Sequence, residues 1–426
     1  MVEFNKTSSV PGPAVQPILG MANPKSPIIV EDAAAPPLGD FLDLSGRRKV
    51  TDVILDREPT KALGQPTKSF ADGYGRVKHL ALQLSGYAGG STRREMLNAY
   101  KTLFTRMEPD TKFTIVVEGD RDRRDVEKAI QEADVQNPER IEFLQPNNLD
   151  LTVWARDQMI SLFLPNDPDH TGLTNQHMLH NWHGDDMQVP PLIAEKYPTI
   201  MLDTNPRIVS DGGDEVSSPR QTFLGFYSLA ATAKELQESG QRDARLKDRV
   251  VKFYEEATGK NVRLSGSDNP FRFKVVPREN PEKLHRFPYE VIPDDAYRAP
   301  SLGPNDRSEE QMWLDLAYNV FTEEYGKKIT VMGLDDPSTP QHEKPASDHL
   351  DMSLTPIDEK TALVGDPSLI KRAFQEMSPE ELRQAEARLS EISGRPVNLD
   401  VLLSETPALT KTQGNIQHDF DMYAQT

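Results

Sequence analysis

The sequence predicts an α/β fold, because segments with the pattern of strands alternate with segments with the pattern of helices. Short apolar and β-branched runs typical of strands occupy residues 80–84, 113–117 and 141–144. Between the first two, Thr92 and Glu95 have capping-box spacing, and Met96, Tyr100, Leu103 and Met107 recur at helical intervals. A short helix at residues 126–133 completes the alternation.

The alternation continues downstream. Strands are expected on both sides of an acidic bend, at residues 208–216 and 222–227, followed by a long polar helical region at 230–257 and a proline-rich loop at 268–304. Ser308 and Gln311 then form a capping box for a helix that Gly326 ends, and a strand follows at residues 329–332. Helices dominate after Asp366, one of them beginning at Ser378.

The N-terminal part differs in composition from the rest. Residues 1–70 contain nine prolines, which oppose regular helices and strands. The sequence therefore predicts two regions, a disordered or extended arm at 1–75 and an α/β domain at 76–426.

Charge and cysteine content exclude several classes of function. The formal net charge of −18 disfavours nucleic acid as a partner. No apolar run is long enough to cross a bilayer and no signal peptide is recognised, so we expect no membrane partner and a cytoplasmic location. The chain has no cysteine, which excludes disulfides, thiolate zinc sites and a cysteine nucleophile within these 426 residues.

A histidine between two carboxylates is the first candidate site. From His349 polar and apolar residues alternate, which predicts a half-buried strand with His349, Asp351 and Ser353 on one face. A histidine can move protons while a nearby carboxylate holds positive charge. A His-x-Asp pattern also arises often by chance.

Three further motifs carry chemistry, and each has an ordinary structural alternative. Arg156–Asp157 interrupts a strand-like run and is also compatible with a structural ion pair. Asp211 and Asp214 flank two glycines that allow a ligand close to the backbone, or simply form a turn. The third is a histidine series, interpreted as a solvated loop rather than a metal site: His177, His180 and His183.

Together, Trp154–Ala155–Arg156–Asp157, Asp211–Gly212–Gly213–Asp214 and His349–Leu350–Asp351, set among strand-helix-strand units, resemble the guanidino-group-modifying (pentein) superfamily. This superfamily includes arginine, agmatine and peptidylarginine deiminases and amidinotransferases. The resemblance implies a five-bladed α/β propeller with a central acidic funnel. It also implies a small-molecule or peptidyl guanidino substrate, and no cofactor.

The resemblance also implies roles for individual residues. Asp157 and Asp351 would grip the guanidinium group, which carboxylates hold through paired hydrogen bonds. His349 would be the general acid and base. Asp211 stands where some deiminases have glutamate, so it is a candidate third contact. Possible support comes from three residues: Trp154, Arg156 and Asp214.

The family nucleophile is a cysteine near the C-terminus, and this sequence has none. We therefore expect a propeller that lacks its closing C-terminal segment, a chain that is inactive alone, and a second chain that completes it. Two alternatives stay open. One is a non-catalytic guanidinium-binding or interaction protein. The other is a metal-dependent hydrolase with His349, Asp351 and Asp157 as ligands.

Overall fold

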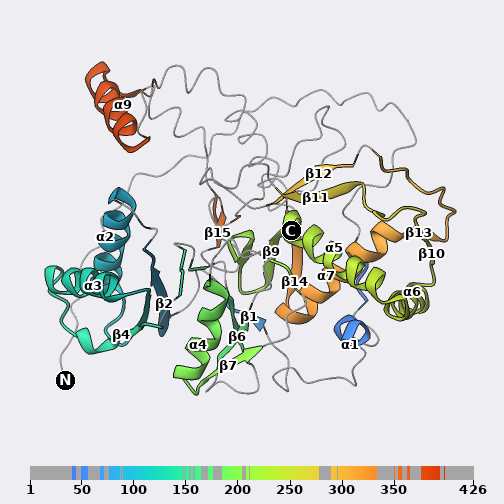
Figure 1. Cartoon of the computed structure of the whole chain (residues 1–426), viewed down its shortest axis with the longest axis horizontal. Helices are drawn as coiled ribbons and strands as arrows, with labels where there is room; N and C mark the ends of the chain where they lie inside the picture. Colours follow the sequence, from blue (N-terminus) through green and yellow to red (C-terminus); the bar gives the residue numbers. More distant parts are fainter. Residues whose placement is uncertain are drawn as a thin grey trace, which may run out of the picture. The chain divides into compact units, whose positions relative to one another are not determined.

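The computed structural model divides the chain into two units, residues 1–36 and 37–426. The structure describes parts of the second unit, shown in colour in Figure 1. The described residues are 41–44, 49–55, 68–71, 76–86, 88, 90–146, 149–152, 155–156, 159–164, 171–175, 185–203, 208–210, 212–277, 289–294, 296–332, 350, 354–356, 362–364, 376–393 and 398.

The first sheet is fully parallel, in the order β2 (His79–Leu84), β3 (Lys112–Val117), β4 (Ile141–Leu144). Two α-helices and a short 3-10 helix connect these strands: α2 (Gly90–Arg106), α3 (Asp120–Glu132) and η1 (Pro138–Arg140). Phe113 and Ile115 of β3 are fully buried and pack with Phe104 of α2 and Val126 of α3. The strands predicted here are confirmed.

The second sheet is mixed, in the order β1 (Lys68–Ser69), β5 (Met159–Phe163), β6 (Thr171–Asn175), β7 (Ile200–Asp203). Strands β5 and β6 are antiparallel, and β6 and β7 are parallel. The 3-10 helix η3 (Asp186–Gln188) and helix α4 (Val189–Lys196) lie between β6 and β7 in the chain, with prolines in the first turn of α4.

The third sheet repeats this plan. Its order is β8 (Glu215–Ser217), β9 (Gln221–Gly225), β14 (Lys328–Met332), with β8 antiparallel and β14 parallel to β9. A 3-10 turn, η4 (Gly212–Asp214), precedes β8. Two helices pack with this sheet in the largest hydrophobic cluster, α5 (Phe226–Arg242) and α7 (Glu309–Tyr325).

Helix α7 forms as the sequence predicts. The Ser308 hydroxyl accepts a hydrogen bond from the Gln311 amide, and Gly326 ends the helix with a left-handed φ of 57°. Its buried face includes Trp313 and Phe321, which are at most 1% exposed.

An antiparallel hairpin with a parallel third strand thus occurs twice, as β5–β6 with β7 and as β8–β9 with β14. The connection from β6 to β7 contains η3 and α4, whereas the connection from β9 to β14 contains α5, α7 and the region between them. A third antiparallel pair, β15 (Leu354–Pro356) and β16 (Ala362–Val364), has the form of the start of such a unit. The architecture is mixed α/β with small sheets. The described residues contain no closed ring of sheets.

The region predicted as a long helical region and a proline-rich loop contains more regular structure than expected. Asp243 ends α5 and caps α6 (Ala244–Thr258), so the helical region is two helices. The proline-rich loop prediction for 268–304 is wrong over β11 (Phe273–Pro277) and β12 (Tyr289–Pro293), which pair with each other. Strand β10 (Asn261–Arg263) pairs with β13 (Asp306–Ser308). Pro277 and Pro293 are the last residues of β11 and β12, which among the described strands pair only with each other. A missing N–H is tolerated at such strand ends.

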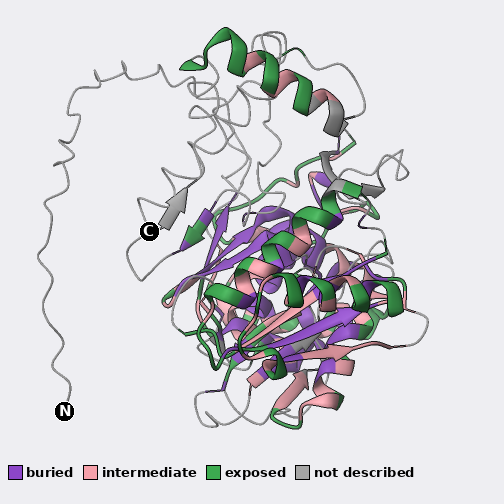
Figure 2. Cartoon of the chain, turned by 90° about the vertical axis from the view of Figure 1, so that its left-hand side faces the viewer, coloured by how far each residue is buried: buried purple, intermediate pink, exposed green. Residues whose placement is uncertain are grey.

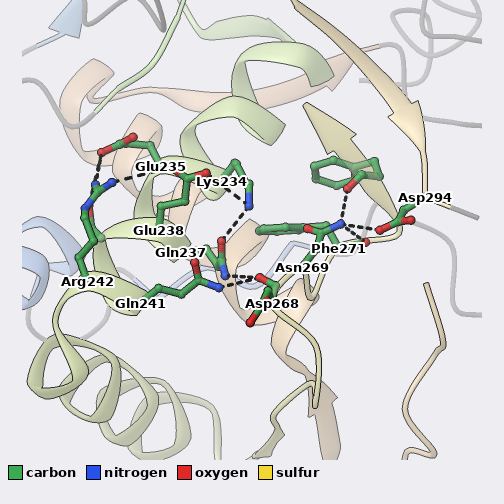
Figure 3. Close-up of polar contacts among 12 residues, drawn as sticks. Lys234, Glu235, Gln237, Glu238, Gln241, Arg242, Asp268, Asn269, Phe271 and Asp294 are labelled. Carbon is green, nitrogen blue, oxygen red and sulfur yellow. Dashed lines mark hydrogen bonds and ion pairs between the residues drawn. The ribbon is translucent and has the colours of Figure 1, made fainter. Parts of the chain in front are cut away.

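Polar contacts fix this region against α5 (Figure 3). The side-chain amides of Gln237 and Gln241 both donate to the Asp268 carbonyl, at 3.1 and 2.6 Å. The Asn269 amide donates to the carbonyls of Phe271 and Phe273 and to the Asp294 carboxylate, at 3.1, 3.0 and 2.9 Å. The chain leading into β11 is therefore held by side chains rather than by a sheet ladder.

Within the predicted arm, two described stretches pack on α7. Phe41 stacks on Tyr318, and α1 (Val50–Leu55) contributes to the same hydrophobic cluster. Three carboxylate or amide side chains one turn apart on α7 accept hydrogen bonds from backbone amides of these stretches: Asp315 from Leu42, Asn319 from Leu44 and Glu323 from Val50 and Thr51. The boundary at residue 75 stays a prediction.

The C-terminal described helix is α9 (Pro379–Ser393), whose side chains, where described, are exposed or half-buried (Figure 2). Ser378 caps it, since its hydroxyl accepts from the Glu381 amide while the Glu381 carboxylate accepts from the Ser378 amide. Among the described helices, none combines the length and the apolar character needed to cross a membrane.

Candidate functional site

The structure describes two of the seven residues proposed for the site, Arg156 and Asp214. Five lie outside the described residues: Trp154, Asp157, Asp211, His349 and Asp351. The histidine series of residues 177, 180 and 183 also lies outside them. Where the chain is described, no three His, Asp or Glu side chains are grouped so that they could hold a metal ion.

Arg156 joins two motifs that are more than fifty residues apart in sequence. Its Nε donates to the Gly212 carbonyl at 3.0 Å, and its Nη2 donates to the Glu215 carbonyl at 2.6 Å. The guanidinium group is planar and permanently charged, so it can hold two carbonyls in fixed positions. Arg156 therefore fixes the 155–156 segment against η4 and the start of β8.

The chain just before Trp154 is also fixed. The Leu151 amide donates to Glu118 at 2.7 Å, and the Thr152 amide donates to Asp186 at 3.0 Å. Asp186 is fully buried and also accepts from the Gln83 amide at 2.7 Å. Leu151 and Thr152 before Trp154, and Arg156 after it, are thus hydrogen-bonded to separate parts of the fold.

Asp214 and Glu215 are adjacent carboxyls that are 0% and 2% exposed. The Ser228 hydroxyl of α5 donates to Asp214 Oδ2 at 2.8 Å, and the Tyr325 hydroxyl of α7 donates to Glu215 Oε1 at 2.5 Å. Ser210 Oγ contacts Glu215 Oε1 and lies 3.1 Å from Ser228 Oγ. Hydroxyl groups therefore surround this pair.

Burial raises the pKa of Glu215 to about 8, and the charge of Asp214 acts in the same direction. The hydrogen bonds from Ser210 and Tyr325 and the charge of Arg156 lower the pKa but do not offset burial. Burial therefore favours the protonated form of the Glu215 carboxyl.

The histidine motif reaches the same sheet through its central residue. Leu350 is 2% exposed and packs with Val216 of β8, Phe223 of β9 and two further apolar residues, Met332 and Leu354. Leu350 itself lies in a 3-10 turn, and the next described strand is β15, which begins at Leu354. The other residues of the predicted strand, 349 and 351–353, lie outside the described residues. Strand β15 contacts β8. All three motifs therefore have a described residue at or beside β8.

Sequence reasoning missed four members of the buried network: Ser210, Glu215, Ser228 and Tyr325. Glu215 directly follows the predicted Asp214, so its position in an acidic string was a usable signal. Ser228 stands in an apolar run of α5 and Tyr325 at the end of α7, 110 residues from Glu215. Their partnership depends on the packing of helices, which has no local pattern.

No protein-family model matches this chain, and no curated protein matches it. Solved structures that are similar to it include agmatine deiminases, which belong to the pentein superfamily. The C. jejuni enzyme is 16% identical over 40% of this chain and 49% of its own length, with a TM-score of 0.29. The Enterococcus faecalis enzyme is 14% identical over 39% and 47%, also with a TM-score of 0.29.

A substrate-bound variant of the C. jejuni agmatine deiminase is matched over more of its length. It is 12% identical over 72% of this chain and 85% of its own, with a TM-score of 0.31. The chain spans about half the length of the first two structures. At these values the likeness supports no inference about individual residues.

Proposed function

We propose that this chain binds the guanidinium group of a small-molecule or peptidyl guanidino compound, in a site of the kind used by deiminases and amidine hydrolases. One observation carries the proposal: three motifs distant in sequence converge on β8. Arg156 is hydrogen-bonded to Gly212 and Glu215, and Leu350 packs on Val216.

The proposed binding residues are the sequence neighbours of these described residues. Asp157 follows Arg156, Asp211 precedes Gly212, and His349 and Asp351 flank Leu350. Carboxylates hold a guanidinium through charge-assisted, paired hydrogen bonds. In this proposal Asp157 and Asp351 grip the guanidinium, Asp211 adds a contact, and His349 is the general acid and base for hydrolysis to a ureido product and ammonia.

The proposed framework is a five-bladed α/β propeller. Its support is the antiparallel hairpin with a parallel third strand, which occurs as β5–β6 with β7 and as β8–β9 with β14, with β15–β16 as a third hairpin. Repetition of one unit is how propellers are built. A second chain that contributes to the ring remains part of the proposal.

The absence of cysteine favours a second candidate, a binding protein without catalysis. Deiminase chemistry of this type needs a thiolate that attacks the guanidinium carbon, and these 426 residues contain none. Serine and threonine hydroxyls are weaker nucleophiles without a committed base. We therefore expect this chain to bind guanidino compounds and to form no ureido product by itself.

Calorimetric titration with paired ligands tests the proposal. Arginine and agmatine should bind, while ornithine and putrescine, which carry amines in place of the guanidinium, should bind at least tenfold more weakly. Asp157→Asn should lower arginine affinity about tenfold or more, because a charged hydrogen bond contributes about 1.5–3 kcal/mol. The matched control is Asp110→Asn, at an exposed carboxylate paired with Arg76.

Equal affinity for arginine and ornithine, or no binding of any guanidino compound, would refute the site. Ureido product formed by the chain alone would refute the non-catalytic alternative. Binding without product would favour it.

A further inference from the structure

The buried carboxyls of Asp214 and Glu215 are linked by an unbroken chain of oxygen atoms. It runs from Tyr325 Oη to Glu215 Oε1 at 2.5 Å, then to Ser210 Oγ, then to Ser228 Oγ at 3.1 Å, and finally to Asp214 Oδ2 at 2.8 Å. The side chains come from α7, β8, the segment before η4, α5 and η4 itself. Four contacts within hydrogen-bonding distance therefore connect five oxygen atoms.

Each of these contacts needs one hydrogen atom between its two oxygens. Tyrosine and serine hydroxyls carry one hydrogen each, and an ionised carboxylate carries none. Tyr325, Ser210 and Ser228 together supply three hydrogens for four contacts. The fourth hydrogen can come only from a protonated carboxyl, either at Glu215 or at Asp214.

Two arrangements satisfy all four contacts. With the proton on Glu215, Glu215 donates to Ser210, Ser210 to Ser228, and Ser228 to Asp214. With the proton on Asp214, Asp214 donates to Ser228, Ser228 to Ser210, and Ser210 to Glu215. Tyr325 donates to Glu215 in both. A shift of three hydrogens along the chain converts one arrangement into the other without any change in heavy-atom contacts.

We propose that Asp214 and Glu215 share a single proton, which Ser210 and Ser228 relay between them, so that the pair carries one negative charge in the folded chain at neutral pH. The full burial of both carboxyls disfavours a second charge. Among the described residues, the titratable and charged groups that face Glu215 are Arg156, Asp214 and Tyr325. Arg156 provides one positive charge opposite the single negative charge of the pair.

The raised pKa of Glu215 agrees with this proton count and sets the pH window. Its ordinary value is 4.5 and its folded value is about 8. Between these values the folded chain holds one more proton than the unfolded chain. The unfolding equilibrium constant should therefore rise with pH, by up to tenfold per pH unit for this one proton, and level off above pH 8.

Two amide variants test whether the proton is shared. Glu215→Gln and Asp214→Asn each supply an N–H donor in place of the shared proton, so either variant lets the remaining carboxyl ionise with its contacts satisfied. In both variants the unfolding equilibrium constant should rise less steeply with pH than in wild type, by up to tenfold per pH unit. Both should also remove the infrared carbonyl band of one protonated carboxylic acid. The comparison is made with wild type because Asp315, whose pKa burial raises to about 6, also titrates in this range.

Asp214→Asn gives the decisive result. If Glu215 held its proton independently, Asp214→Asn would leave both the pH dependence and the infrared band unchanged, and that outcome overturns the proposal. Should an amide variant fail to fold, Ser228→Ala is the alternative, because it removes the hydroxyl that links the two carboxyls. The contacts of Glu215 with Tyr325 and Ser210 then remain, and the hydroxyl hydrogens of Tyr325 and Ser210 are enough for both. Ser228→Ala should weaken the band, and an unchanged band would also overturn the proposal. Ser239→Ala on the same helix is the control, because the Ser239 hydroxyl lies 3.4 Å from Glu235 and 3.2 Å from Arg242, two side chains that are partly exposed.

A consequence for ligands rests on the proposed function. A guanidinium bound beside η4 would favour the doubly charged state of the pair, so binding should release part of a proton. Calorimetry of arginine binding at pH 7 in two buffers of different ionisation enthalpy measures this release, and Glu215→Gln should abolish it. Absence of arginine binding would refute the guanidinium site alone, since the infrared and unfolding experiments need no ligand. Binding without proton release would refute the coupling.

Discussion

Two regions of the molecule bury carboxyl groups in different ways. Between α2 and α3, Arg93 donates to Asp122 at 2.6 Å and to Asp125 at 2.8 Å, so a permanent cation balances the carboxylates. Around β8, Asp214 and Glu215 are surrounded by hydroxyl groups of Ser210, Ser228 and Tyr325. Arg93 hydrogen-bonds both of its carboxylates directly, whereas Asp214 and Glu215 accept from hydroxyls, and the positive charge of Arg156 offsets their burial only in part.

The difference determines which region responds to pH near neutrality. Hydroxyl-lined carboxyls keep a proton because burial penalises the ion, and the pKa of Glu215 is raised to about 8 for this reason. Asp315 on α7 behaves in the same way. Burial raises its pKa to about 6 despite hydrogen bonds from Tyr254 and Gln311. The half of the fold built on α5 and α7 therefore contains two buried carboxyls whose pKa values burial raises towards neutrality.

The largest expected effect is the loss of the compensating cation. Arg93→Met leaves Asp122, whose side chain is 7% exposed, without its cation, and should lower the free energy of unfolding by about 3 kcal/mol. Denaturant unfolding measures this. The control is Arg76→Met, since Arg76 and Asp110 are both more than half exposed, and a change within about 0.5 kcal/mol is expected. Equal losses in the two variants would remove the distinction between a compensated buried pair and a surface pair.

A smaller loss is expected where a hydroxyl is removed from a buried carboxyl. Tyr254→Phe deletes the hydroxyl that donates to Asp315 at 2.5 Å, which should cost about 2 kcal/mol. Losing a donor to the ionised form raises the folded pKa of Asp315 further above its ordinary 3.8. The folded chain then retains the proton to higher pH, so the loss should be larger at pH 8 than at pH 5.

Unfolding of Tyr254→Phe and wild type at both pH values tests this sign. Tyr318→Phe is the matched control, because its hydroxyl donates to the Ile329 carbonyl at 3.2 Å, and a backbone carbonyl does not titrate. Its loss should be about 1 kcal/mol or less and independent of pH. A pH-independent loss in Tyr254→Phe would contradict the assignment of Asp315 as a proton-holding group.

The features that could be predicted from the sequence are those that depend on residues close together in the chain. Ser308, Gln311 and Gly326 define both ends of α7, and their capping geometry depends only on residues within one turn. The strand pairing of β11 with β12 was missed because proline content suggested a loop. Prolines at the strand ends are compatible with a two-stranded ladder, and no local feature of the sequence reports the partner strand.

The candidate site was predictable only in part, for the same reason. Arg156 and Asp214 were selected from motifs, but that Arg156 binds the Gly212 and Glu215 carbonyls follows from a contact across 56 to 59 residues. The network around Glu215 requires α5 and α7 to approach β8 together. His349, Asp351, Asp157, Asp211 and Trp154 stay predictions.

The smallest expected effect concerns the close packing of α5 against α7. A Cβ atom at Gly240 of α5 would lie 2.9 Å from Cη2 and 3.2 Å from Cζ2 of Trp313, a side chain of α7 that is 1% exposed. Gly240→Ala gains about 1 kcal/mol of helix propensity but forces the two helices apart at a cost of about 2 kcal/mol, leaving a net loss of about 1 kcal/mol. Gly266→Ala, where a Cβ meets no atom within 4 Å, should change stability by less than about 0.5 kcal/mol. If Gly240→Ala is as stable as wild type, the indole ring can move, and α5 and α7 are not closely packed at this contact.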